Sequence, residues 1–212
     1  MPGFIVTGTD TGIGKTVFSA ALTLVLDGVY YKPVQCGLDE DGGGDREAVL
    51  AMTGLDAARA LPGAYRLSAP LSPHRAAEID GVAIDPARLR PPETERPLIV
   101  EGAGGLLVPI TREVLQADLF KTWKLPLVLC ARTALGTINH TLLSVEAART
   151  RDMDLLGIVF IGDENADNER TVVETSGARR LGRLPRLDAL TPTTLATAFA
   201  GNFALSDFGE RA

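Results

Sequence analysis

The stretch VTGTDTGIGKT, residues 6–16, decides the fold class of this chain. It follows the apolar run FIVT (4–7), which is typical of a strand buried on both faces. It leads into GKTVFSAALTLVL (14–26), where apolar residues recur at helical spacing. The glycines let backbone N–H groups approach an anion, and the helix N-terminus adds a partial positive charge. This strand–loop–helix order predicts a phosphate-binding loop, with a ligand-free glycine-rich turn as the alternative.

The glycine spacing differs from that of the common phosphate loop. From Gly8 to the pair formed by Gly14 and Lys15, this chain has one residue more than the common motif. In such a loop Lys15 would reach the β- and γ-phosphate oxygens, and the hydroxyl of Thr16 would ligate Mg²⁺. The loop by itself therefore predicts a nucleotide-binding protein and does not identify a reaction.

Further short apolar runs predict the rest of the sheet. They lie at 28–34, 97–101, 125–131 and 155–161, with a weaker run at 179–185. These runs are continuous rather than alternating, and helical patterns lie between several of them. We therefore expect an α/β fold with a mostly parallel sheet flanked by helices on both faces, the three-layer sandwich of P-loop NTPases. The length of 212 residues fits a single domain over 1–212.

Two other segments complete the outline. The stretch 137–151 has apolar residues at helical spacing and ends in arginines. The stretch 37–96 is rich in glycine and proline at both ends, and it predicts a long excursion with short helices around 45–53 and 73–79. Long connections at the strand ends of an α/β domain are usually functional.

Charge and composition exclude several classes of protein. The net charge is −6 and the pI is near 5.0, which argues against sequence-independent binding to nucleic acid and against a membrane-surface protein. The first residues show no basic segment followed by a long apolar run, so we expect no signal peptide. With two cysteines, Cys36 and Cys130, nothing indicates an oxidising compartment. We expect a cytoplasmic protein with neither nucleic-acid nor membrane partners.

Three polar residues are candidates for the site, and two of them, Lys32 and Glu101, stand outside the carboxyl ends of strands, where ligands collect in a parallel sheet. Lys32, in YYKPVQCG, would offer a fixed positive charge to a transferring phosphoryl group. Glu101 ends the run PLIVE before the small residues 102–105, and its carboxylate suits Mg²⁺ opposite a phosphate loop. Asp45 begins a helical pattern in the glycine-rich segment. The alternative for Lys32 is an ordinary surface lysine, and the alternative for Glu101 is a capping glutamate before a turn. For Asp45 the alternative is a helix N-cap.

With these stretches in place, the chain resembles the dethiobiotin synthetase family. The resemblance rests on VTGTDTGIGKT, YYKPVQCG, APLSPH, VEGAGG and ALGTINHTLLS, which run from residue 4 to about 145, with a looser match to 187. That family carries the longer glycine spacing. Five ordered motifs at the right intervals make the match specific.

The resemblance implies a ligase reaction of biotin synthesis. The expected substrates are 7,8-diaminononanoate, CO₂ or bicarbonate, and ATP with Mg²⁺. One amine would take up CO₂ to form a carbamate, whose oxygen would attack the γ-phosphorus and release ADP. The second amine would then close the ring and expel phosphate. The expected assembly is a homodimer with the substrate site at the interface.

The resemblance also implies roles for individual residues. The catalytic residues implied are Lys32, Lys15 and Thr11, and the Mg²⁺ ligands implied are Thr16, Asp45 and Glu101. The nucleotide is expected to contact Gly12, Ile13, Gly14, Lys15, Thr16, Val17, Asp45, Glu101, Gly102, Ala103 and Gly104. Near the base we expect Gly162, Pro185, Arg186 and Leu187. The diamine is expected to contact Thr11, Lys32, Cys36, Ser72, Pro73, Leu135, Gly136, Thr137, Ile138 and Asn139.

The chain departs from the family pattern in two respects. Members often have serine where Cys36 stands, and a thiol is a weaker hydrogen-bond partner. Many relatives read adenine with an Asn-Asp pair, for which this chain has Ile161 and Gly162. We therefore expect a looser choice of nucleotide, with CTP or GTP competing better than in relatives that have the pair.

Two other protein classes compete with this interpretation. A dimeric P-loop switch ATPase of the partition or septum-positioning type would share the sheet order. Such proteins usually carry an extra lysine early in the loop, where this chain has Thr9 and Asp10, and the tail FALSDFGERA (203–212) is short and acidic for membrane docking. Amidoligases of the cobyrinate type usually append a glutaminase domain, for which the chain is too short.

Overall fold

A seven-stranded sheet forms the centre of the computed structural model, which describes residues 3–209. Neighbouring strands all pair in parallel, in the order β4-β2-β6-β1-β7-β8-β9. The strands are β1 (Gly3–Gly8), β2 (Val29–Tyr31), β4 (Ala60–Leu61), β6 (Leu98–Gly105), β7 (Leu127–Arg132), β8 (Leu155–Ile161) and β9 (Arg180–Leu184). The parallel sheet confirms the predicted α/β class.

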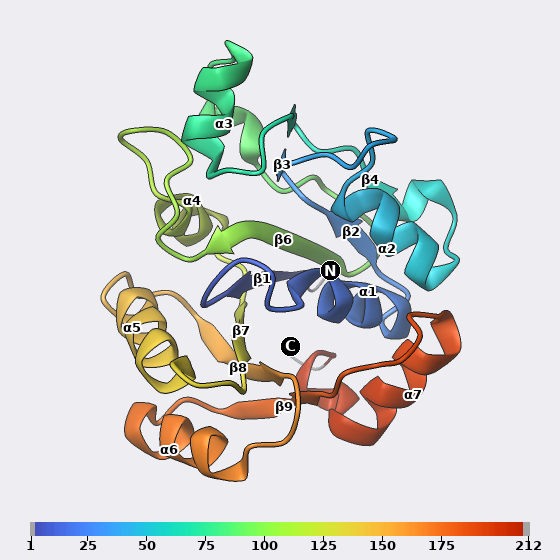
Figure 1. Cartoon of the computed structure of the whole chain (residues 1–212), viewed down its shortest axis with the longest axis vertical. Coiled ribbons are helices and arrows are strands. Elements are labelled where there is room, and N and C mark those ends of the chain that lie inside the picture. The colour runs from blue at the N-terminus through green and yellow to red at the C-terminus, as the bar shows by residue number, and fades with distance from the viewer. Residues whose placement is uncertain (1–2, 210–212) are drawn as a thin grey trace.

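Helices cover both faces of the sheet (Figure 1). One face carries α1 (Lys15–Val25), α2 (Asp45–Thr53) and α7 (Pro192–Asn202), and the other carries α4 (Gln116–Trp123), α5 (Thr137–Arg149) and α6 (Ala166–Ser176). The pleat of β1 explains the division, because Phe4 and Val6 pack in the core cluster with α1 and α7. Ile5 points the other way and packs with residues of α4 and α5. Three layers result, as the sequence predicts.

Helix α1 is the most deeply placed helix near the phosphate loop. Its N-cap, Gly14, has φ 101°, a left-handed conformation that glycine adopts without strain. Phe18 and Leu22 are fully buried, and the Phe18 ring lies 5.6 Å from that of Phe203, centroid to centroid. Because α1 is packed on nearly all sides, the loop that precedes it is held in a fixed position above β1.

The predicted strand 28–34 is wrong as one strand. Strand β2 ends at Tyr31, and β3 (Val34–Cys36) pairs instead with β5 (Tyr65–Leu67) in a separate two-stranded sheet. Pro33 has no N–H to donate, so the chain leaves the main sheet at Lys32. This departure turns the lysine side chain toward the phosphate loop.

The excursion between β2 and β6 otherwise follows the sequence pattern. The expected helices appear as α2 and as α3 (Pro73–Asp80). The short strands β4 and β5 and the 3₁₀ turns Ala57–Arg59 and Pro86–Leu89 were not anticipated. A small core beneath α3 contains Val34, Leu67 and Leu89, so this segment is packed rather than open.

Strand β6 is longer than the predicted run 97–101. It continues to Gly105, which pairs with Gly8, and Glu101 therefore lies inside the strand instead of at its tip. After Glu101 the register against β1 shifts, and pairing resumes at Gly105. The predicted helices 14–26 and 137–151 also end slightly earlier, at Val25 and Arg149.

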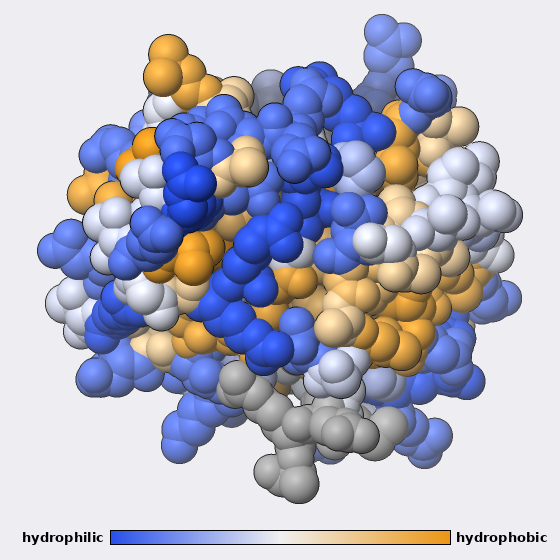
Figure 2. All heavy atoms as spheres, turned by 90° about the horizontal axis from the view of Figure 1, so that it is seen from below, coloured by the Kyte–Doolittle hydropathy of each residue, from blue (hydrophilic) through white to orange (hydrophobic). Residues whose placement is uncertain are grey.

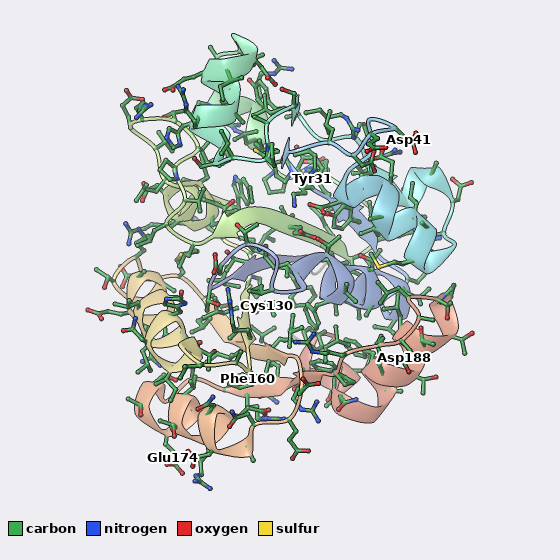
Figure 3. All side chains as sticks on the ribbon, in the orientation of Figure 1. Tyr31, Asp41, Cys130, Phe160, Glu174 and Asp188 are labelled. Atoms are coloured by element: carbon green, nitrogen blue, oxygen red, sulfur yellow. The ribbon has the colours of Figure 1, made fainter. Side chains whose placement is uncertain are left out.

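The surface carries both hydrophilic and hydrophobic side chains. Figure 2 shows hydrophilic side chains interspersed with smaller hydrophobic groups over the face seen from below. In Figure 3, Phe160 lies among packed side chains near the sheet, whereas Glu174 extends outward from α6. Within residues 3–209, no helix is both long enough and apolar enough to cross a membrane.

Candidate active site

The phosphate loop connects β1 to α1 and is held by hydrogen bonds and an ion pair that involve Asp10 and Lys15. Gly12 and Gly14 have φ 70° and 101°. Lys15 is buried, and its Nζ donates a hydrogen bond to the carbonyl of Asp10 at 2.9 Å. The Asp10 carboxylate accepts the N–H of Thr11 at 2.7 Å and pairs with Arg132 at the end of β7. The lysine thus folds back across its own loop.

Glu101 is the centre of a buried polar cluster beside the loop. The residue is 1% exposed, and its carboxylate accepts three hydrogen bonds. Oε1 accepts from the Thr16 hydroxyl at 2.9 Å and from Lys32 Nζ at 3.0 Å. Oε2 accepts from the hydroxyl of Tyr30 at 3.0 Å. Both oxygens of this buried carboxylate therefore accept hydrogen bonds.

Asp45 reaches the same cluster from the excursion. It is the first residue of α2, and its carboxylate forms an ion pair with Lys32 Nζ. Its backbone N–H is held by the side-chain oxygen of Gln35 at 3.0 Å. Lys32 therefore lies between two carboxylates that come from positions far apart in the sequence, Asp45 and Glu101.

The two buried lysines have opposite electrostatic surroundings. Burial lowers the pKa of Lys15, whose Nζ contacts a neutral carbonyl, and the nearby charge of Glu101 only partly offsets it. Burial also acts to lower the pKa of Lys32, but the charges of Glu101 and Asp45 outweigh it, so that pKa is raised. Lys32 is thus held as an ammonium ion at neutral pH.

A cavity of about 820 Å³ opens between the loop, the cluster and the excursion. Predicted site residues that line it are Thr11, Gly12, Gly14, Lys15, Thr16, Lys32, Cys36, Asp45, Ser72, Pro73, Glu101, Ala103 and Gly104. Burial raises the pKa of the Cys36 thiol to about 11, so the wall carries a neutral thiol. The volume lies within the range of small-molecule sites.

Several predicted contacts do not line this cavity. They are Ile13, Val17, Gly102, Gly162, Pro185, Arg186, Leu187 and the segment 135–139. Ile13 is buried in the core cluster with α1, and Gly102 faces Phe120, whose Cζ would lie 2.8 Å from an added Cβ. A nucleotide could still reach the backbone at such positions, but the side chains do not face the cavity.

The cavity also has lining residues that the sequence pattern missed. They are Gln35, Gly37, Leu38, Gly44, Pro70, Leu71 and Val108. Gln35 and Gly37 flank Cys36 in the motif YYKPVQCG, so the motif boundaries could have indicated them. Leu38 and Val108 carry no signal of their own, because only the tertiary structure brings Leu38, in the excursion, and Val108, in the loop after β6, to the cavity.

A second hollow of about 380 Å³ adjoins the first and shares Thr11 and Val108 with it. It extends to His140 and Leu143 on α5. The predicted carboxylate-binding segment 135–139 immediately precedes these residues at the start of α5. The structure therefore brings α5 close to the active-site cavity without making it part of the same wall.

The predicted base-reading region lies next to the loop. Ile161 packs against Gly14, since a Cβ on that glycine would lie 2.9 Å from Ile161 Cγ2. The N–H of Gly162 donates to the carbonyl of Leu184 at 3.0 Å, and its own carbonyl accepts from Arg183. No side-chain amide stands at these two positions.

The oxygen atoms beside the loop fit a magnesium ion. Among the residues that the structure describes, no group of three or more histidine, cysteine, aspartate or glutamate side chains could hold a metal by itself. Thr16, Asp45 and Glu101 nevertheless present a hydroxyl and two carboxylates, which are hard oxygen donors. Mg²⁺ is usually held by one or two carboxylates together with substrate phosphates and water. The donor set therefore suits Mg²⁺ with a nucleotide.

Structural comparisons confirm the fold. The cell division ATPase MinD of Pyrococcus furiosus superposes with a TM-score of 0.56 at 13% identity, covering 95% of this chain and 99% of that one. A ParA family ATPase from Chlorobium tepidum TLS gives a TM-score of 0.51 at 10% identity, covering 92% and 96%. At these identities the likeness shows the fold and nothing of the reaction.

Sequence comparisons are more specific. A family model described as an AAA domain matches residues 2–194. The ATP-dependent dethiobiotin synthetase BioD of Rhodopseudomonas palustris (strain BisB5) is 65% identical over 96% of this chain and 95% of its own length. The enzyme of the same name from Agrobacterium fabrum (strain C58 / ATCC 33970) is 58% identical over 98% and 97%. Given this near-full-length identity, and a phosphate loop beside a buried acidic cluster, the chain belongs to the family of ATP-dependent dethiobiotin synthetases, ligases of biotin biosynthesis.

Proposed function

We propose that this ligase carboxylates 7,8-diaminononanoate with CO₂ and closes the cyclic urea of dethiobiotin, converting ATP to ADP and phosphate. One observation carries the proposal. A phosphate loop, a lysine flanked by two carboxylates, and Ser72 and Pro73 all line the same cavity. We propose that the loop and the lysine bind the anionic groups and that Ser72 and Pro73 contact the diamine.

The proposed chemistry needs positioning and charge more than proton transfer. One amine attacks the carbon of CO₂ and loses a proton, which gives a carbamate. The carbamate oxygen attacks the γ-phosphorus as the bond to ADP breaks, which gives a carbamic–phosphoric anhydride. The second amine attacks the carbonyl carbon, the ring closes and phosphate leaves. Phosphoryl transfer of this kind depends mainly on alignment and on neutralisation of charge.

The residues of the site have distinct proposed tasks. Lys15 exchanges the Asp10 carbonyl for phosphate oxygens, and Thr11 contacts the γ-phosphoryl group. Thr16, Asp45 and Glu101 would hold Mg²⁺, which when bound neutralises phosphate charge. Lys32, already protonated, stabilises the carbamate and the charge that develops during transfer.

We also propose that the active form is a homodimer that binds the substrate carboxylate across its interface. Leu135, Leu107 and Leu143 are 99%, 47% and 56% exposed, and the last two line the hollow beside the cavity. Exposed apolar side chains gathered in this way favour a protein contact. The N–H of Thr137 donates to the carbonyl of Ala134, so the other N–H groups in the first turn of α5 would receive the carboxylate. For the compartment, our proposal is the cytoplasm.

The proposal also concerns which nucleoside triphosphates the site accepts. Because an isoleucine and a glycine occupy positions 161 and 162, the base would meet an aliphatic side chain and backbone groups here. Backbone groups alone discriminate less between bases than a fixed side-chain amide does. We propose that other nucleoside triphosphates are accepted alongside ATP.

The test is an ADP-release assay with and without the diamine and bicarbonate. We expect ADP formation to require both, and the Lys32→Ala variant to lose this stimulation. ATP hydrolysis that is indifferent to the diamine would contradict the proposal and favour a switch ATPase. The MinD-like and ParA-like structures share only the fold, so they supply no independent argument for that alternative.

A further inference from the structure

Tyr30 is a fully buried residue of β2 whose hydroxyl donates to Glu101 Oε2 at 3.0 Å. The two strands are neighbours in the sheet, with Tyr30 opposite Ile99, two residues before Glu101. Both side chains therefore point to the same face, toward α1 and α2. The contact is a product of strand register, because the residues are 71 positions apart.

The two oxygens of the Glu101 carboxylate have different hydrogen-bond partners. Oε2 is held by Tyr30, while Oε1 is left for the loop and accepts from Thr16 and Lys32. A carboxylate is planar, so holding one oxygen fixes where the other one points. The hydrogen bond from Tyr30 thus fixes the orientation of the Glu101 carboxylate relative to the phosphate loop.

Tyr30 is itself absent from the cavity wall. It cannot contact nucleotide or substrate, and any effect on them must pass through Glu101. Given the metal site of the proposed function, on which this step rests, we propose that Tyr30 is a positioning residue that orients Glu101 for Mg²⁺–nucleotide binding. The partners that orient metal ligands commonly affect metal affinity about 10–100-fold when they are removed.

Replacing Tyr30 with phenylalanine isolates the hydroxyl. The ring keeps its place in the core cluster, whereas Glu101 Oε2 loses its donor and the carboxylate can rotate away from the loop. Tyr31 supplies a matched control on the same strand. Its side chain packs on the other face with Val29 and Leu98 near Trp123, and within residues 3–209 its hydroxyl has no hydrogen-bond partner.

The experiment measures metal binding directly. Mn²⁺ replaces Mg²⁺ as the probe, and its binding with ADP is followed by electron paramagnetic resonance for wild type, Tyr30→Phe and Tyr31→Phe. We expect Tyr30→Phe to weaken the Mn²⁺–ADP complex about 10-fold or more. ADP binding in EDTA should stay within about twofold, because Tyr30 acts through a metal ligand. Tyr31→Phe should behave as wild type in both measurements.

The outcomes separate the two claims. If wild type binds Mn²⁺ and Tyr30→Phe binds it equally well, the role of Tyr30 is wrong and the metal site stands. If wild type binds no Mn²⁺ with ADP, the metal site fails and the role of Tyr30 fails with it. A structural defect alone would weaken ADP binding in EDTA as much as in Mn²⁺, which would also overturn the inference.

A second measurement covers the case in which Tyr30→Phe does not fold. The chain has three tyrosines, so labelling with 3-fluorotyrosine gives a simple fluorine spectrum. Tyr31→Phe and Tyr65→Phe assign the remaining signal to Tyr30. Titration with Mg²⁺ and ADP should shift the Tyr30 signal more than that of Tyr31, and a Tyr30 signal that does not move would refute the role.

Discussion

Lys32 Nζ lies 3.0 Å from Glu101 Oε1, the same oxygen that accepts the hydroxyl of Thr16. The lysine with a proposed role in catalysis thus shares an oxygen with the proposed metal site. A magnesium ion at Thr16, Asp45 and Glu101 would compete with the ammonium group for the two carboxylates. An ion bound there would therefore weaken the hold of the two carboxylates on Lys32.

Lys32→Ala should stop the chemistry while leaving nucleotide binding largely intact. We expect kcat to fall by about 10²–10³-fold, because a fixed positive charge near the transferring group is lost. The variant should also unfold more easily, by about 3 kcal/mol, since Glu101 loses its buried counter-charge. Single-turnover kinetics, calorimetric ADP titration and denaturant unfolding measure the three quantities.

The exposed Lys121 of α4 supplies the control for this variant. Lys121→Ala should leave turnover and stability unchanged. In Lys32→Ala, Mg²⁺ with ADP should recover part of the lost stability by restoring positive charge between the carboxylates. Wild-type turnover by Lys32→Ala would show that the assigned role is wrong.

Lys15→Ala should differ by acting on binding as well as on turnover. Within residues 3–209 the ammonium group of Lys15 donates one hydrogen bond, to the neutral carbonyl of Asp10, which phosphate oxygens could replace. We expect activity to be abolished and ATP affinity to drop by at least about 10-fold, the usual scale for a lost hydrogen bond to a charged group. Isothermal titration with ATP tests this, and unchanged affinity would contradict it.

The Cys36 thiol should react slowly at neutral pH. Its pKa is raised from 9.0 to about 11 by burial, and the thiolate is the reactive form. At pH 8, a pKa of about 11 in place of 9.0 lowers the thiolate fraction of Cys36 about 100-fold. Alkylation by iodoacetamide at this pH should therefore be about 100-fold slower than for an ordinary thiol. The rate should keep rising toward about pH 11.

Cys36→Ser identifies the contribution of this residue, because the remaining Cys130 is buried. Mass spectrometry of the alkylated chain over a pH series gives the rates. A plateau near pH 9 would show that the thiol is as acidic as a free cysteine.

Nucleotide choice should be loose. Initial rates with ATP, CTP and GTP at sub-saturating concentrations should be of similar size, because positions 161 and 162 offer no amide. Ile161→Asn should raise the preference for ATP by up to about 10-fold, the upper end of the net value of one added hydrogen bond. Ile161→Val is the packing control. A strong preference of the wild type for ATP would contradict the expectation.

The homodimer should depend on the apolar side chains beside α5. Leu143→Asp should convert dimer to monomer in sedimentation experiments and raise the KM for the diamine, because its carboxylate site would be lost. Leu190 is also exposed, at 42%, and lies on the segment that precedes α7. Leu190→Asp should leave the assembly intact. A wild-type chain that sediments as a monomer would refute the interface.

Much of the fold follows from local sequence alone. The runs at 4–7 and 155–161 appear as β1 and β8, and α2 begins at Asp45, inside the predicted range. These predictions succeed because buried parallel strands and helix starts have strong local signatures. Strand 28–34 fails because its apolar composition hides the break that Pro33 imposes.

The sequence by itself determined the phosphate loop, the family and the residue types of the site. Those depend on glycine conformations, on a helix N-terminus and on motif spacing, all of which are local. Only the tertiary structure decided that Tyr30 holds Glu101 and that Lys32 lies between two carboxylates. These contacts depend on the register of β2 against β6 and on the docking of α2, which join residues that are distant in the chain. Burial makes these contacts matter for stability, because a charged group that is removed from water is destabilising unless a neighbouring group pairs with it.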